Sequence, residues 1–194
     1  MTYISSSQGV LGWDTGPANA LMDAWIHVCL NKEYDHLGLW ADSGEVIPAL
    51  LEEFLSDPYF AMKPPKSTGR DYFSLAWQER FTQNKAYSSE DVQATLRELT
   101  VKTINDAFEK NIGRLDHLTC YLHGKGVCNE SVVNKLREAL PCKIKTSNDI
   151  GIPIEDFEGA LFAWLAYCYH TRKPLDLTKI TGASESAILG CAYI

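Results

Sequence analysis

Apolar residues recur three and four positions apart in six stretches of the chain, and this spacing predicts helices that each bury one face. The longest of these helices is about as polar as it is apolar, so we expect it on the surface of the domain. A seventh, shorter helix is predicted near the end of the chain, over residues 185–190. The six longer helices are predicted over residues 17–30, 45–55, 71–81, 88–110, 130–140 and 153–168.

Short apolar segments predict strands in two parts of the chain. Residues 2–5 and 10–13 are joined by a polar turn and predict a hairpin. Residues 116–122 and 143–146 flank a glycine-containing turn and the helix predicted over 130–140. A strand, a turn, a helix and a second strand in this order form a parallel crossover, so the sequence predicts an α/β fold.

The helix predicted over residues 153–168 has one carboxylate beside its apolar face. Steps of 100° place its apolar residues within an arc of about 120°, and Glu158 falls at the edge of that arc. A carboxylate on a buried face must be paired or must serve a ligand. Two interpretations of Glu158 therefore stand, a structural ion pair or hydrogen bond and a binding role.

A lone carboxylate stands between the second strand and the first long helix. Asp14 follows the strand directly, Gly16 permits backbone geometry that a β-carbon forbids, and Pro17 suits the first turn of a helix. The N–H groups and dipole of a helix N-terminus favour negative charge, on the protein or on a ligand. Asp14 either caps the helix, as aspartate often does, or carries chemistry.

Two further turns are candidate ligand sites. The loop over residues 63–70 contains Lys66 and Arg70, which suit an anion, although a solvated loop explains the same residues. The turn over residues 123–129 contains Gly124 and follows a predicted strand, and such turns bind ligands in open α/β sheets. Glycine also serves packing alone in turns of this kind, so both alternatives stay open.

The composition narrows the possible functions. The 194-residue chain has a formal net charge of −7, which argues against a nucleic-acid surface because such surfaces are basic. None of the six cysteines belongs to a C-x-x-C pair, so no metal site is expected and the thiols suit a reducing compartment. No apolar run approaches the length of a membrane span, and the first residues do not form a signal peptide. A cytoplasmic domain is therefore expected.

Five motifs occur in order along nearly the whole chain. The first contains Asp14 and continues into the following helix, and the others lie at residues 65–70, at 91–96, from Glu158 onward and at 181–184. They read Asp-Thr-Gly-Pro-Ala-Asn, Pro-Lys-Ser-Thr-Gly-Arg, Asp-Val-Gln-Ala-Thr-Leu, Glu-Gly with Phe-Ala-Trp-Leu-Ala, and Thr-Gly-Ala-Ser. Together they resemble the anhydro-N-acetylmuramic acid kinase family.

This resemblance implies an actin/hexokinase-type (ribonuclease H-like) fold with two lobes and a cleft for ATP and Mg²⁺. It implies a reaction in which water opens the 1,6-anhydro ring of the sugar and O6 is phosphorylated, as part of cell-wall recycling. Asp14 matches the family's general base. Gly16, Pro17 and Asn19 match substrate-binding residues around it, and Glu158 matches a carboxylate that lines the sugar site.

The same resemblance implies nucleotide contacts. A Gly-Gly-Gly-x-x-Asn turn of the family corresponds to Gly124, Lys125, Gly126 and Asn129. Lys125 replaces the middle glycine, where a lysine either contacts a phosphate or blocks the close approach that glycine permits. Ala18 likewise replaces a glycine beside the catalytic turn.

A family motif of the type Gly-Thr-Ser-x-Asp-Gly-x-Asp is absent, so residues 1–194 resemble the C-terminal lobe of such a kinase, as a single domain with a mixed sheet and several helices. We expect no activity of this chain alone, and activity with a separate N-terminal half. Two alternatives remain open, a non-catalytic module for dimerisation or partner binding and a diverged nucleotide-binding domain. Surfaces normally shared with the other lobe would be exposed, so a homodimer is also expected.

Overall fold

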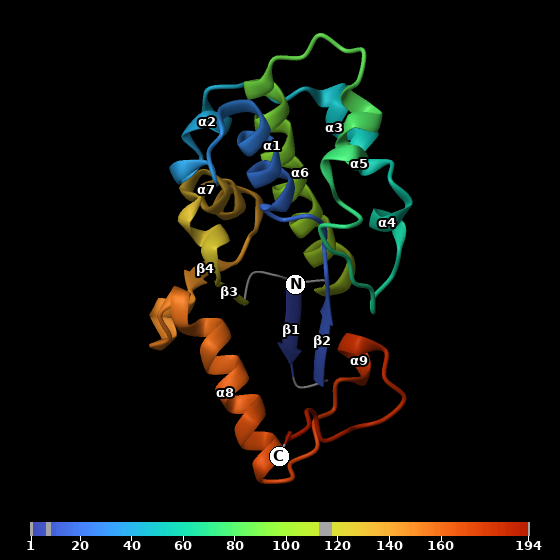
Figure 1. The fold of residues 1–194 in the computed structure, drawn as a ribbon, viewed down its shortest axis with the longest axis vertical. Helices are drawn as coiled ribbons and strands as arrows, with labels where there is room; N and C mark the ends of the chain where they lie inside the picture. Colours follow the sequence, from blue (N-terminus) through green and yellow to red (C-terminus); the bar gives the residue numbers. More distant parts are fainter. Residues whose placement is uncertain (1, 7–8, 113–117, 194) are drawn as a thin grey trace.

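A computed structural model describes residues 2–6, 9–112 and 118–193 of the chain. Figure 1 shows an elongated molecule in which helices α1 to α7 form one body, a β-hairpin lies below that body, and α8 and α9 occupy the other end. The α-helices are α1 (Ala20–Leu30), α2 (Leu39–Asp42), α3 (Pro48–Leu55), α4 (Pro58–Ala61), α5 (Leu75–Thr82), α6 (Ser89–Ile112), α7 (Glu130–Ala139), α8 (Phe157–His170) and α9 (Thr178–Thr181). The short 3₁₀ helices are η1 (His36–Gly38), η2 (Lys125–Cys128), η3 (Ser147–Ile150) and η4 (Ile154–Asp156).

The strands form two small sheets. β1 (Thr2–Ser6) and β2 (Gly9–Trp13) pair antiparallel, with Thr2 opposite Trp13, which confirms the predicted hairpin. β3 (Thr119–Leu122) and β4 (Lys143–Thr146) pair in parallel on either side of α7, which confirms the predicted crossover and a mixed α/β architecture. Residues 116 and 117 of the predicted third strand lie outside the described residues.

Several predicted helices are confirmed with later starting points. α1 begins at Ala20, α3 at Pro48 and α5 at Leu75. The start of α5 is fixed by its N-cap Ser74, whose hydroxyl accepts the N–H of Trp77 at 3.3 Å. Periodicity locates a buried face, whereas the first residue of a helix depends on cap geometry of this kind.

α6 is the central helix of the body, so its predicted place on the surface is wrong. It packs against α1, α2, α3 and α7. Its polar residues Gln93 and Arg97 are buried with its apolar ones. Their burial is possible because they find partners, since Arg97 pairs with Asp42 and donates to the hydroxyl of Ser131 at 2.9 Å. A mixed polar and apolar composition did not reveal these long-range partners.

An aromatic cluster joins α3, α4 and α5. The ring of Trp77 lies 5.1 Å from that of Phe54 and 5.1 Å from that of Phe73, measured between ring centres. The ring of Tyr59 lies 5.3 Å from that of Phe73. These spacings are those of favourable aromatic pairs, and all four side chains are buried. The cluster therefore fixes α4, which carries Tyr59, against the body.

Asp57 lies buried inside this cluster and collects hydrogen bonds. Its carboxylate caps α4 by accepting the N–H of Tyr59 at 2.9 Å. It also accepts the indole N–H of Trp77 at 2.8 Å and the hydroxyl of Tyr72 at 2.7 Å. The guanidinium of Arg80 lies 3.7 Å away. One carboxylate thus joins α4, α5 and the segment between them.

α8 does not bury the face that its apolar spacing predicts. Leu161 and Trp164 are exposed, and so is Glu158 at the predicted edge of that face. Cys168 is buried near the end of the helix. Figure 1 shows α8 extending away from the helical body. Periodicity identifies a face that can be buried, but a face is buried only where another element packs against it.

The C-terminal segment differs from the prediction as well. Residues 185–190 do not form a helix, and the short helix α9 comes before them. Instead, Ala187 forms a backbone bridge with Leu175, whose N–H donates to the Ala187 carbonyl at 2.9 Å. This non-local pairing satisfies backbone groups that a local helix would otherwise satisfy. α9 packs against β2, which brings the end of the chain to the hairpin.

Candidate active site

Asp14 follows the last residue of β2 and is held by a loop that lies about fifty residues later in the sequence. Its N–H donates to the carbonyl of Lys66 at 3.1 Å, and its carboxylate accepts the N–H of Thr68 at 3.0 Å. Its carbonyl accepts the hydroxyl of Tyr59 at 2.7 Å. Backbone and side chain of Asp14 are therefore both fixed.

Asp14 does not cap α1, so the capping interpretation is wrong. The helix begins at Ala20, and its N-cap is Asn19, which makes no side-chain cap hydrogen bond. The carboxylate of Asp14 is bound by the loop rather than by the first turn of the helix. A carboxylate anchored in this way can take a proton from a water or a hydroxyl group, which is the task of a general base.

The residues after Asp14 pack tightly against the helical body. A β-carbon on Gly16 would lie 3.2 Å from the ring of Phe60 in α4 and 3.2 Å from the hydroxyl of Thr103 in α6. Pro17 is buried. Gly16 is therefore required by a close approach of the backbone to two helices, which holds the Asp14 turn against the body.

The loop over residues 63–70 uses its polar groups inside the protein. The ammonium of Lys66 donates to the Tyr59 carbonyl at 2.8 Å and lies 4.3 Å from the centre of the Tyr59 ring. Burial lowers the pKa of Lys66, and the nearby ammonium of Lys110 lowers it further. Both lysines line a cavity of about 50 Å³ beside the Asp14 turn. The observed part of this loop in the site is to hold Asp14.

The turn between β3 and α7 meets the far end of the Asp14 turn. Gly124 has φ +78° and ψ 173°, a conformation that glycine alone adopts without strain. Gly126 faces Asn19, because a β-carbon on Gly126 would lie 3.3 Å from the side-chain oxygen of Asn19. The structure therefore brings together residues from two predicted sites, the substrate-binding turn and the nucleotide-binding turn.

Asn129 and Lys125 differ in their surroundings. The side-chain oxygen of Asn129 caps α7 by accepting the N–H of Val132 at 3.1 Å, and the residue is buried. Its observed role is structural, since it fixes the start of the helix that follows the turn. Lys125 is exposed at the start of η2, on the same turn.

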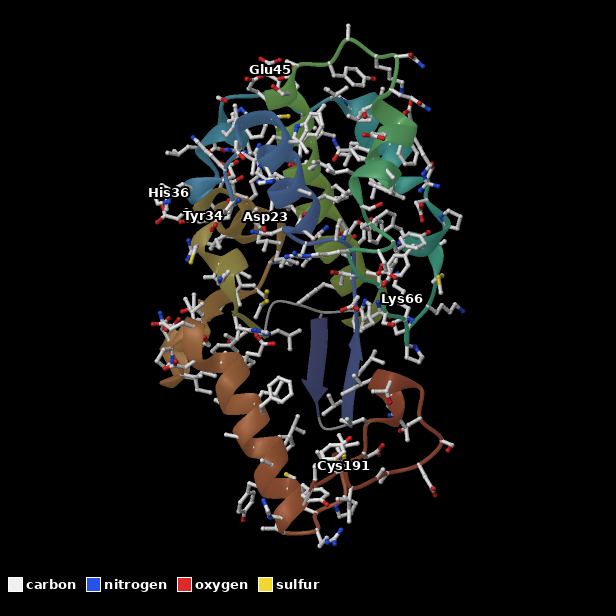
Figure 2. All side chains as sticks on the ribbon, viewed as in Figure 1. Asp23, Tyr34, His36, Glu45, Lys66 and Cys191 are labelled. Carbon is white, nitrogen blue, oxygen red and sulfur yellow. The ribbon has the colours of Figure 1, made fainter. Side chains whose placement is uncertain are left out.

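Asp23 in the first turn of α1 is a carboxylate to which sequence reasoning assigned no role. Burial raises its pKa to about 6, while Arg70 lowers it and Asp35 raises it. A perturbed carboxylate close to a candidate site is itself a functional candidate. Figure 2 places Asp23 on α1 and Lys66 beside the segment that follows α4. The available sequence signal was the place of Asp23 in the first motif, close behind Asn19, whose carbonyl accepts its N–H at 2.9 Å.

Glu158 is separate from these residues. It lies in the first turn of α8 and is exposed. Among the residues that the structure describes, no hydrogen bond or ion pair joins it to the Asp14 turn. Within residues 2–6, 9–112 and 118–193 there is also no group of three or more histidine, cysteine, aspartate or glutamate side chains arranged to hold a metal ion.

Comparison with known proteins identifies the family. The family model described as anhydro-N-acetylmuramic acid kinase matches residues 1–194. The chain belongs to this family. Proteins named anhydro-N-acetylmuramic acid kinase are 43% identical in Nitrosomonas europaea and 41% identical in Legionella pneumophila (strain Lens), each over 100% of this chain and over 53% and 52% of those proteins. One from Coxiella burnetii (strain RSA 493 / Nine Mile phase I) is 41% identical over 96% of this chain and 50% of its own length. The chain thus spans about half the length of the curated relatives it matches.

Within this kinase family member, Ala18 stands in a conformation that disfavours alanine. Its φ is +48°, in the left-handed region, and its carbonyl accepts the hydroxyl of Thr100 at 2.9 Å. A side chain in this region costs roughly 1–2 kcal/mol relative to glycine because the β-carbon crowds the backbone. The position is the one at which the sequence departs from the glycine that the resemblance implies, so the turn retains the geometry of a glycine.

Replacing Ala18 by glycine is expected to stabilise the protein by about 0.5–1 kcal/mol, because relief of strain exceeds the added freedom of the unfolded chain. The midpoint of thermal unfolding should rise by about 1–4 °C. Ala163→Gly is the matched control, since Ala163 is exposed inside α8 and glycine there should destabilise by about 1 kcal/mol. A lower midpoint for Ala18→Gly, as for the control, would contradict the strain.

Proposed function

We propose that this chain is the C-terminal lobe of an anhydro-N-acetylmuramic acid kinase, with an actin/hexokinase-type fold over residues 1–194 and Asp14 as the general base. The observation that carries the proposal is the Asp14 carboxylate, fixed at the tip of β2 by the N–H of Thr68 at 3.0 Å. Family membership supports the reaction class. The full activity is assigned to this lobe together with a second lobe.

In the proposed reaction, water attacks the carbon at position 1 of the anhydro sugar while Asp14 takes a proton from that water. The bond between this carbon and O6 breaks, and O6 receives a phosphoryl group, which ATP supplies when bound. A positioned general base contributes about 10²- to 10⁴-fold to rate. The hydrogen bonds to Asp14 from the loop serve this step, because a carboxylate fixed in direction lowers the entropic cost of reaching the transition state.

The sugar is proposed to lie against Gly16, Pro17 and Asn19, on the turn that packs against α4 and α6. Glu158 is proposed as a further carboxylate that accepts hydrogen bonds from sugar hydroxyl groups, which are strong when the acceptor is charged. Because Glu158 is exposed on α8, its place in the site depends on what packs against that helix.

The nucleotide is proposed to bind at Gly124, Lys125, Gly126 and Asn129. The residues suit this group, since Gly124 has no atom within 4 Å of a β-carbon position, outside its chain neighbours, and Lys125 is exposed for a phosphate contact. Mg²⁺ would arrive on the nucleotide's phosphates and neutralise charge there. Asn129 would act mainly through α7, whose start it caps.

Partners follow from the half-length match. We propose that a separate polypeptide equivalent to an N-terminal lobe completes the cleft, and that the chain otherwise self-associates as a homodimer through its exposed surfaces. The cytoplasm is the proposed location, since ATP and the recycled sugar meet there.

The test combines two polypeptides. The isolated chain is expected to give no measurable turnover of anhydro-N-acetylmuramic acid with ATP and Mg²⁺. Co-expression with the part of the Legionella pneumophila (strain Lens) relative that this chain does not match is expected to restore turnover. Phosphorylated sugar measured by mass spectrometry is the readout. Turnover by the isolated chain, or none by an assembled complex, would overturn the proposal.

A non-catalytic partner-binding module is the second candidate. It is favoured by the strained Ala18 and by Lys125 in place of glycine in the nucleotide turn. Calorimetric titration of the assembled complex with ATP separates the two candidates. Association with a partner but no heat of nucleotide binding would favour the module.

A further inference from the structure

α8 exposes large apolar side chains around most of its circumference. Leu161 and Trp164 are each 45% exposed, Tyr167 is 62% exposed and Phe162 is 63% exposed. At 100° for each residue these four side chains span about 220° of the helix. We call these four residues the α8 face. Figure 2 shows α8 standing clear of the helical body along much of its length.

A lipid bilayer does not suit this face. With 14 residues, α8 is about 21 Å long, whereas the hydrocarbon core of a bilayer is about 30 Å thick. In the part of the chain that the structure describes, no helix is long and apolar enough to cross a membrane. α8 contains no lysine or arginine, and a net charge of −7 opposes binding to anionic lipid surfaces.

A polypeptide partner suits the α8 face better. Tryptophan, tyrosine and phenylalanine are the residues that supply most of the binding energy in the centres of protein interfaces. The relatives from Legionella pneumophila (strain Lens) and Nitrosomonas europaea extend for about half their length outside the region that matches this chain. The hairpin offers a second contact, because among the described strands β1 pairs with β2 alone and so presents one edge.

We infer that the α8 face is the docking surface for a polypeptide equivalent to the half of the relatives that this chain does not match. The identity of this partner rests on the proposed function, whereas the choice of surface rests on the exposure of the four side chains. Glu158 lies in the first turn of the same helix. Docking on α8 therefore also encloses Glu158, which turns an exposed carboxylate into part of a site.

The experiment co-expresses the tagged chain with the unmatched part of the Legionella pneumophila (strain Lens) relative and measures the amount of that polypeptide recovered with the tag. The test variant is Phe162→Asp combined with Tyr167→Asp, which places two charges on the α8 face. The matched control is Tyr193→Asp, because Tyr193 is exposed and lies outside α8. Wild type and control are expected to recover equal amounts, and the test variant at least tenfold less.

Folding of the variants is checked separately by circular dichroism and thermal unfolding. Both substituted side chains are mostly exposed, so the unfolding midpoint of the test variant should match that of the control. If the double variant does not fold, Phe162→Ser alone is used, with an expected loss of at least threefold in recovery. Loss of binding with an unchanged unfolding midpoint supports docking on the α8 face.

Other outcomes overturn the inference. Equal recovery by wild type and a folded test variant places the contact elsewhere, and recovery of no partner by wild type removes the proposed occupant. A homodimer of wild type in sedimentation that the test variant abolishes assigns the face to a second copy of the chain. Binding of wild type to phosphatidylcholine vesicles assigns it to lipid. Docking without sugar phosphorylation would support this inference and contradict the proposed function.

Discussion

Asp14→Asn is expected to lower kcat of the assembled kinase by about 10³-fold, with little change in KM for the sugar. The amide of asparagine cannot take up the proton of the attacking water. Its oxygen can still accept the N–H of Thr68, which lies 3.0 Å from the carboxylate in the wild type, so the turn should keep its geometry. The loss therefore belongs to proton transfer rather than to folding.

The measurement is steady-state turnover of wild type and variant after assembly with the same partner polypeptide. Glu138→Gln is the matched control, because it makes the same chemical change at an exposed position on α7 away from the Asp14 turn. The control should retain full turnover. An unchanged kcat in Asp14→Asn would show that another group activates the water, and Asp23 would be the next residue to test because its pKa of about 6 suits proton transfer near neutral pH.

Asp57→Ala is expected to destabilise the protein by about 3 kcal/mol, because it leaves buried donors of α4 and α5 without an acceptor. The indole of Trp77 and the hydroxyl of Tyr72 both lose a hydrogen bond shorter than 3 Å. In a chain of this size the midpoint of thermal unfolding should fall by about 6–12 °C. Asp71→Ala is the control, since Asp71 is an exposed carboxylate of the same region, and its cost should stay within about 0.5 kcal/mol.

Asp57 also predicts a dependence of stability on pH. Burial by itself would raise its pKa, but the hydrogen bonds from Trp77, Tyr72 and the Tyr59 N–H outweigh burial and hold the pKa below 3.8. The unfolded state therefore binds the proton more readily than the folded state. The stabilisation is complete above about pH 5 and is lost as the pH falls through the lowered pKa.

Thermal unfolding measured between pH 6 and pH 2.5 checks this sign. The difference in unfolding midpoint between wild type and Asp57→Ala should be largest near pH 6 and should shrink in acid. A difference that stays constant with pH would mean that the carboxylate acts through packing alone, without a change in proton affinity on folding.

Removing Asp57 should also affect the site. Tyr59 is held by the Asp57 cap on one side and donates to the Asp14 carbonyl on the other. Burial raises the pKa of Tyr59, and the charge of Asp14 raises it further, so its hydroxyl remains a donor at neutral pH. The aromatic cluster therefore connects stability of the body to the position of the general base.

The amino-acid sequence by itself determined the features that depend on nearby residues. Helical spacing located α1, α3, α6 and α7, and apolar runs around a polar turn located the hairpin. The order of strand, glycine turn, helix and strand predicted the parallel pair of β3 and β4. The ordered motifs identified the family, which the comparison confirmed over residues 1–194.

Tertiary structure decided which of these faces and polar groups are covered. α6 is central because Arg97 finds Asp42 and Ser131 on other helices, and no spacing rule encodes such partners. Asp14 binds Thr68 across a loop instead of capping α1, since a carboxylate takes the donor that the fold brings nearest. α8 is apolar by sequence yet exposed, because burial requires a second surface and not only an apolar one.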